Sequence, residues 1–240
     1  METTEKLESL VAKLSAAYNK ARTKEDYEKV VIIGNEVVAN MSGETSDMIV
    51  INALPAGWAR YYYLLKFFSP EERKEGVTNL LGWIEGLLSS VEDPENKVAL
   101  LYLKSVILSY LVGNQIDANW CIVSISKIIS RKKVSIASTL ELINASGIAE
   151  MSQKKWREAV NAFSEIERFQ VKVLRQPENL RYAANILSNL GASYVRGDIS
   201  IIDGKEYLLI ARDYYLQEEL PPKKHLEGIK NRLREAEEKL

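Results

Sequence analysis

Apolar residues recur at spacings of three and four along most of this chain, which is the pattern of helices that bury one face. Near the amino terminus the stripe consists of Leu7, Leu10, Val11, Leu14 and Tyr18. The same pattern predicts about eleven helices along the whole chain. Their expected bounds are about 4–21, 24–41, 47–68, 70–91, 95–113, 116–131, 134–152, 155–169, 178–196, 203–218 and 222–239.

Several helix starts are marked by capping residues. Thr23 with Asp26 has the spacing at which a hydroxyl and a carboxylate satisfy the first amide groups of a helix, and so does Ser69 with Pro70 and Glu72. Asp93 before Pro94 offers a further N-cap. We expect Pro55 to interrupt the third helix, because proline removes a backbone donor.

The predicted connections are short, so consecutive helices should be antiparallel neighbours. Ten of the helices then pair into five hairpins. The last helix, in PPKKHLEGIKNRLREAEEKL, is polar enough to cap the end of a stack. We therefore expect one helical-repeat domain over residues 1–240, with its weakest boundary in ANMSGETSD at 39–47.

Composition supports an all-α class. Only 6 prolines and 12 glycines punctuate the 240 residues, which favours long helices over the frequent turns of a β-sandwich. The longest apolar run, at 98–112, contains Lys104 and is shorter than the roughly 20 residues that span a bilayer. Cys121 is the only cysteine, so no intrachain disulfide can form. These features predict a cytoplasmic protein that does not enter a membrane.

One stretch, ASGIAEMSQKKWREAVNAF at 145–163, places small and large residues at regular spacings. Gly147 and Ala159 would allow two helices to cross closely, while Trp156 and Phe163 fill the grooves beside them. This packing pattern resembles the tetratricopeptide repeat (TPR), a helix pair of about 34 residues. We expect Ala159 and Gly147 to lie at a helix crossing.

A second copy of the pattern begins in NLGASYVRGD. Gly191 occupies the small position there, and we expect Ala211 and Tyr215 to be its partners after an insertion, ISIIDG. The resemblance covers residues 140–218 best. It implies a right-handed α-α solenoid that binds a protein or peptide partner in a concave groove. The groove-facing positions would then be Glu141, Asn144, Met151, Asn185, Ser188 and Arg196.

Charge is unevenly distributed, although the net charge is only −1. Residues 127–181 carry 11 Lys or Arg against 6 Asp or Glu. Loops that join one predicted hairpin to the next should emerge along one edge, which would gather a basic edge there. This edge could steer an acidic partner segment, or stay ordinary solvated surface, whereas the small net charge argues against nucleic acid. Its residues are Arg131, Lys132, Lys133, Arg168, Lys172 and Arg175.

No catalytic, metal-binding or cofactor-binding constellation is evident, so we expect a binding module or scaffold and not an enzyme. His225 is the only histidine, and we expect it at the surface. The aromatic cluster WARYYYLLKFF, at 58–68, leaves more open. It is either buried between hairpins, part of a ligand pocket, or a subunit interface. The alternatives to a peptide-binding module are thus a helical enzyme or small-ligand binder with an aromatic pocket, or a homodimer.

Overall fold

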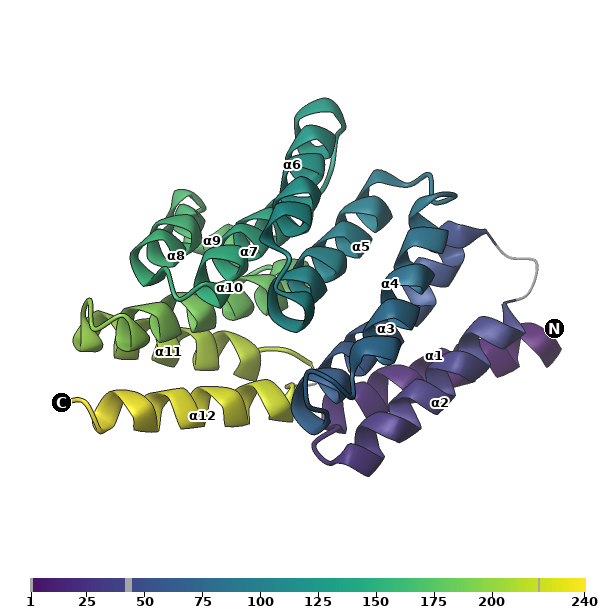
Figure 1. Ribbon diagram of the computed structural model, residues 1–240, viewed down its shortest axis with the longest axis horizontal. Helices are drawn as coiled ribbons and strands as arrows, with labels where there is room; N and C mark the ends of the chain where they lie inside the picture. The colour runs from purple at the N-terminus through teal and green to yellow at the C-terminus, as the bar shows by residue number, and fades with distance from the viewer. Residues whose placement is uncertain (1, 42–44, 220) are drawn as a thin grey trace.

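The computed structural model describes residues 2–41, 45–219 and 221–240, and within these ranges the chain forms helices and no strands (Figure 1). The all-α class is confirmed. The α-helices are α1 (Glu2–Lys20), α2 (Lys24–Asn40), α3 (Ser46–Phe67), α4 (Lys74–Leu88), α5 (Pro94–Ile107), α6 (Gln115–Arg131), α7 (Ile136–Ser152), α8 (Trp156–Phe163), α9 (Val171–Leu174), α10 (Pro177–Arg196), α11 (Ile201–Leu216) and α12 (Lys223–Glu237).

Most helix ends follow the local signals in the sequence. Thr23 and Asp26 form the expected capping box at the start of α2, and Asp93 accepts hydrogen bonds from two first-turn amides of α5. Pro55, in contrast, lies inside an uninterrupted α3, so the expected break there is wrong. The helix expected over 155–169 is divided into α8 and a 3-10 segment, η2 (Ser164–Arg168). Of the weak boundary predicted at 39–47, residues 42–44 lie outside the described residues.

The helices form an inner and an outer row. Along the inner row, α1 contacts α3, α3 contacts α5, α5 contacts α7, and α7 contacts α10. Each inner helix also packs against the helix that follows it, as in α1 with α2, α5 with α6, α7 with α8, and α10 with α11. Figure 1 shows the resulting arc, which rises from α1 through α5 and descends again through α10 and α11.

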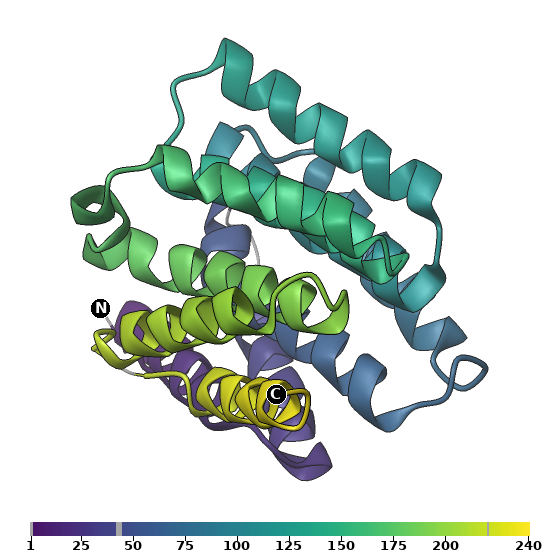
Figure 2. The ribbon, with the colours of Figure 1, turned by 90° about the vertical axis from the view of Figure 1, so that its left-hand side faces the viewer.

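The last helix brings the arc back to its beginning. α12 packs against α10 and α11, as a capping helix would, but it also contacts α1. An ion pair of 4.0 Å joins Arg22, just after α1, to Glu227 of α12. In Figure 1 the yellow α12 accordingly begins next to the purple helices, and Figure 2 shows both at the same end of the molecule. The inner faces of the first and last helices therefore look into the same central space.

Small residues allow close crossings within the helix pairs. A Cβ atom added at Gly147 would overlap the ring of Phe163, and both Phe163 and Ala159 are fully buried. The crossing of α7 with α8 thus has the composition that the sequence predicted. At the next pair, Gly191 faces Gly204 and Leu208 of α11, and an added Cβ would lie 2.6 Å from the Gly204 carbonyl oxygen.

The expected partners of Gly191, Ala211 and Tyr215, are therefore wrong. α11 begins at Ile201, so most of the supposed insertion ISIIDG belongs to the helix. The register error arose because Gly204 was treated as part of a loop, although it is the small residue of the crossing. Ala211 and Tyr215 are nevertheless buried further along the same helix.

Within the described residues, no helix is both long and apolar enough to cross a lipid bilayer.

Candidate functional site

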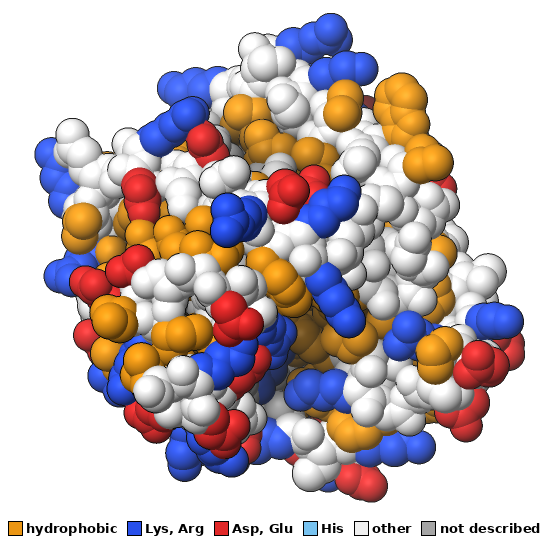
Figure 3. Space-filling view, turned by 60° about the vertical axis from the view of Figure 1, so that its left-hand side comes forward, with side chains coloured by type: hydrophobic (Ala, Val, Ile, Leu, Met, Phe, Trp, Pro, Cys, Tyr) orange, Lys and Arg blue, Asp and Glu red, His pale blue; other side chains and the backbone are white. Residues whose placement is uncertain are grey.

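A cavity of about 660 Å³ lies at the centre of the arc. The five helices of the inner row and α12 all contribute to its wall. The space-filling view shows a recess with a hydrophobic floor and several Lys and Arg side chains around it (Figure 3). The volume lies within the range of roughly 300–1,000 Å³ that is usual for ligand pockets.

Aromatic side chains make up much of the cavity wall. Trp58 packs against Tyr61, Tyr62 and Tyr102, with ring centroids 5.2–6.3 Å apart. Burial raises the pKa of Tyr62 to about 12, so its hydroxyl remains a hydrogen-bond donor at neutral pH. The tyrosines of the wall are Tyr18, Tyr27, Tyr61, Tyr62, Tyr102, Tyr110, Tyr182 and Tyr215.

The aromatic cluster at 58–68 is divided between two faces of α3. Trp58, Tyr61 and Tyr62 line the cavity, whereas the Tyr63 hydroxyl donates a 2.7 Å hydrogen bond to Glu28 of α2. Helical geometry requires such a division, because successive residues are about 100° apart. Three members of the cluster therefore line the cavity, and Tyr63 belongs to the contact with α2.

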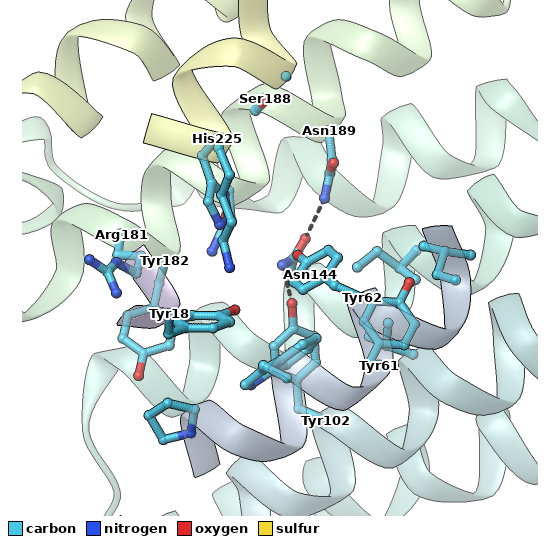
Figure 4. Close-up of a pocket in the computed structure, with 18 of the residues that line it drawn as sticks. Tyr18, Tyr61, Tyr62, Tyr102, Asn144, Arg181, Tyr182, Ser188, Asn189 and His225 are labelled. Atoms are coloured by element: carbon cyan, nitrogen blue, oxygen red, sulfur yellow. Dashed lines mark hydrogen bonds between the residues drawn. The ribbon is translucent and has the colours of Figure 1, made fainter. Parts of the chain in front are cut away.

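All six predicted groove residues line this cavity: Glu141, Asn144, Met151, Asn185, Ser188 and Arg196. Several belong to a hydrogen-bond network. Asn144 donates to the Tyr102 hydroxyl and accepts a 3.0 Å bond from Asn189, as the dashed lines in Figure 4 show. Arg232 of α12 continues the network, donating to Asn189 and, at 2.6 Å, to the Ser188 hydroxyl. The network fixes these side chains in position before anything binds. Their role in binding a partner remains a prediction.

Glu141 is the only carboxylate among the described residues that line the cavity. Burial raises its pKa to about 8, and the negative charge of Glu95 adds to this effect. Glu141 is therefore mostly protonated at neutral pH and can donate a hydrogen bond into the cavity.

Five cationic side chains line the same cavity: Lys66, Arg181, Arg196, Lys224 and Arg232. Arg181 pairs with Glu218, and Arg196 pairs with Glu235 at 3.3 Å. Across residues 2–41, 45–219 and 221–240, Lys66, Lys224 and Arg232 form no ion pair with a carboxylate. With Glu141 mostly neutral, the cavity carries an excess of positive charge.

His225 is not a surface residue, contrary to the sequence-based expectation. Its side chain descends from α12 into the cavity (Figure 4), and Nδ1 lies 3.0 Å from the Tyr215 hydroxyl. Tyr215 donates its single hydroxyl hydrogen to Asn185 and therefore accepts from Nδ1–H of a neutral imidazole. Burial, together with the charges of Lys224 and Arg181, holds the pKa of His225 well below its usual value. The expectation was wrong because the final helix has polar residues on the face that lines the cavity as well as on the face that meets solvent.

The six residues of the predicted basic edge, Arg131, Lys132, Lys133, Arg168, Lys172 and Arg175, are all exposed. The connection at 132–135 and the segment at 169–176, which contains α9, emerge on the same side of the molecule, as Figure 2 shows. Arg168 pairs with Glu165 at 2.6 Å, and Arg175 lies over the Tyr214 ring. The geometric premise of the basic edge is thus met, and its role in steering a partner remains a prediction.

Sequence reasoning missed the contribution of α12 to the cavity. Lys224, Gly228 and Arg232 are spaced four residues apart and so share one helix face. That spacing was available in the sequence, but nothing local showed that this face turns inward. Lys66 and Arg181 were missed for the same reason.

Comparison with known proteins gives no relative for this chain: no family model, no curated protein and no solved structure matches it.

Proposed function

We propose that this protein is a TPR-like α-α solenoid that binds a short segment of a partner protein in its central cavity. The observation that carries the proposal is the position of the six predicted groove residues, all of which line one cavity with tyrosine and cationic neighbours. Amide side chains such as Asn185 can donate and accept hydrogen bonds at once, as a peptide backbone requires. Tyrosine adds apolar contact area together with a polar group.

Gly228 offers a direct test of this proposal. It lines the cavity, and an added Cβ would meet no atom within 4 Å. Gly228→Trp should therefore fill cavity space without disturbing a helix crossing. Gly86 of α4 is a matched control, since its Cβ position is also open and it lies outside the cavity wall.

The experiment is capture from cells of the source organism with the wild-type chain, Gly228→Trp and Gly86→Trp, followed by mass spectrometry of proteins and small molecules. We expect the wild type and Gly86→Trp to retain the same partner protein and Gly228→Trp to lose it. Equal retention by all three variants would place the partner outside the cavity. Retention of a small molecule alone, lost in Gly228→Trp, would instead identify a small-ligand binder, to which the cavity volume is equally suited.

We further propose that the basic edge steers acidic partner segments toward the cavity. Opposite charges accelerate encounter, and salt screens them over a Debye length of about 8 Å at physiological ionic strength. Reversing Lys132, Lys133, Lys172 and Arg175 to Glu should slow association with the captured partner and flatten its dependence on salt. Unchanged association rates across a salt series would leave the edge as ordinary solvated surface.

A second candidate, self-association, is favoured by the outer face of α6. Ile116 and Trp120 are 73% and 62% exposed, and they lie four residues apart on one helix face. If this face joins two copies, Trp120→Glu should convert a dimer to a monomer in light scattering. A wild-type chain that is monomeric at high concentration would contradict this candidate.

A further inference from the structure

The amino group of Lys224 occupies an unusual position in the cavity. Its Nζ lies 3.2 Å from the centroid of the Tyr18 ring and 4.6 Å from that of Tyr62. The Nζ atom is buried, yet no described residue accepts a hydrogen bond from it. An ammonium group has three donors, and aromatic faces attract its charge without supplying oxygen acceptors.

Further cations lie close to Lys224. Lys66 approaches the Tyr27 hydroxyl at 3.4 Å, and Arg181 pairs with Glu218 on one side. Burial and the charges of Arg181 and Lys66 together hold the pKa of Lys224 well below its usual range. Glu218 is the carboxylate that pairs with one of these three basic groups, and the exposed Glu227, which pairs with Arg22, partly offsets the charge of Lys66. His225, which also faces this end of the cavity, is neutral.

A buried basic group without a hydrogen-bonding partner is costly, and an anion at this position would relieve both the missing hydrogen bonds and the mutual repulsion. Lys66, Arg181 and Lys224 line the cavity from α3, α10 and α12, so the three groups come together only when α12 returns to α1.

We propose that Lys224, Lys66 and Arg181 form a binding subsite for one oxyanion group, a carboxylate or a phosphate, of the molecule that occupies the cavity. The inference rests on the proposed function only in assigning the group to the cavity's occupant. The subsite itself should bind small oxyanions on its own. Charge-assisted hydrogen bonds from buried amino and guanidinium groups are among the stronger polar interactions in proteins.

The test uses the whole 240-residue chain with inorganic phosphate and with acetate, each compared with chloride at equal ionic strength. Thermal unfolding and titration calorimetry would be measured for the wild type, Lys224→Met and Lys223→Met. Methionine removes the charge but keeps an unbranched side chain. Lys223 is exposed at the start of α12 and is therefore the matched control.

We expect a saturable rise in melting temperature for the wild type and Lys223→Met, and about tenfold weaker anion binding for Lys224→Met. Lys66→Met, which leaves the Lys224 side chain in place, should weaken binding in the same direction. The stronger of the phosphate and acetate effects identifies the preferred oxyanion.

Equal stabilisation of all variants would show only a general salt effect and would overturn the subsite. So would the absence of any saturable effect in the wild type. Circular dichroism of each variant checks that it folds, and Lys66→Met provides an independent test if Lys224→Met does not. Because no partner is needed, the subsite can fail while Gly228→Trp still abolishes capture, and the reverse outcome is equally distinguishable.

Discussion

Gly147 and Gly228 are both helical glycines, but they belong to regions of opposite character. Gly147 lies at the crossing of α7 and α8, where an added Cβ would overlap the buried ring of Phe163. Gly228 lies on the inner face of α12, where an added Cβ would meet open space. The first glycine permits close packing, and the second leaves room in a cavity. The comparison shows that the role of a helical glycine depends on what its helix face packs against, and not on the residue type.

The largest expected effect is at the crossing. Gly147→Leu should lower the free energy of unfolding by about 3 kcal/mol or more, because the new side chain would overlap the fully buried ring of Phe163. Ala159→Phe, which overpacks the same crossing from the other helix, should cost roughly 1–3 kcal/mol or more. Gly82→Leu on the open face of α4 is the control and should be neutral or slightly stabilising. Chemical denaturation would measure the free energy of unfolding of all three variants. If Gly147→Leu had the same free energy of unfolding as the wild type, the close crossing would be refuted.

On the cavity side, Glu141 should make stability depend on pH. Its pKa is about 8 in the folded chain against 4.5 for the ordinary side chain, so the folded state holds a proton that the unfolded state has released. The contribution of Glu141 to stability is therefore fully present below about pH 4.5 and is lost as the pH rises toward 8. The expected loss is about 2 kcal/mol, since the cavity is partly open to water. Glu141→Gln should abolish this part of the pH profile, and an unaltered profile would mean that the carboxylate is solvated.

His225 should act in the opposite direction. Its pKa is lowered in the folded chain, so the unfolded state binds the proton first as the pH falls below about 6.5 and stability declines. His225→Gln should reduce this acid loss and cost about 1 kcal/mol at neutral pH through the weakened contact with Tyr215. Thermal unfolding between acidic and neutral pH would measure both. If the variant matched the wild type throughout, the imidazole would have to be exposed.

The smallest effect is expected at Gly228. Gly228→Ala should stabilise the chain by up to about 1 kcal/mol, because alanine is the better helix former and the added methyl group meets nothing. Gly147→Ala, the same change at the crossing, should destabilise the chain despite the same gain in helix propensity. Denaturation of both variants would measure the two changes in the free energy of unfolding. If both had the same sign, the contrast between the crossing and the cavity would be lost.

The sequence by itself determined the helices, many of their ends and the small residues of the α7–α8 crossing. These features depend on hydrophobic periodicity and capping groups, which act over a few residues. The TPR resemblance also selected six residues that line one cavity, although it gave no sign that the cavity is closed by α12.

Only the tertiary structure decided the inward position of Lys224, His225 and Arg232, and the division of the aromatic cluster between cavity and α2. Each depends on the turn accumulated over successive helix pairs, which brings α12 back to α1. A local pattern shows that a helix face is polar, but not whether that face meets solvent or another part of the chain. The sequence of α12 would show the same polar face in both cases, because the pattern of polar and apolar residues depends only on the helix itself and not on what packs against it.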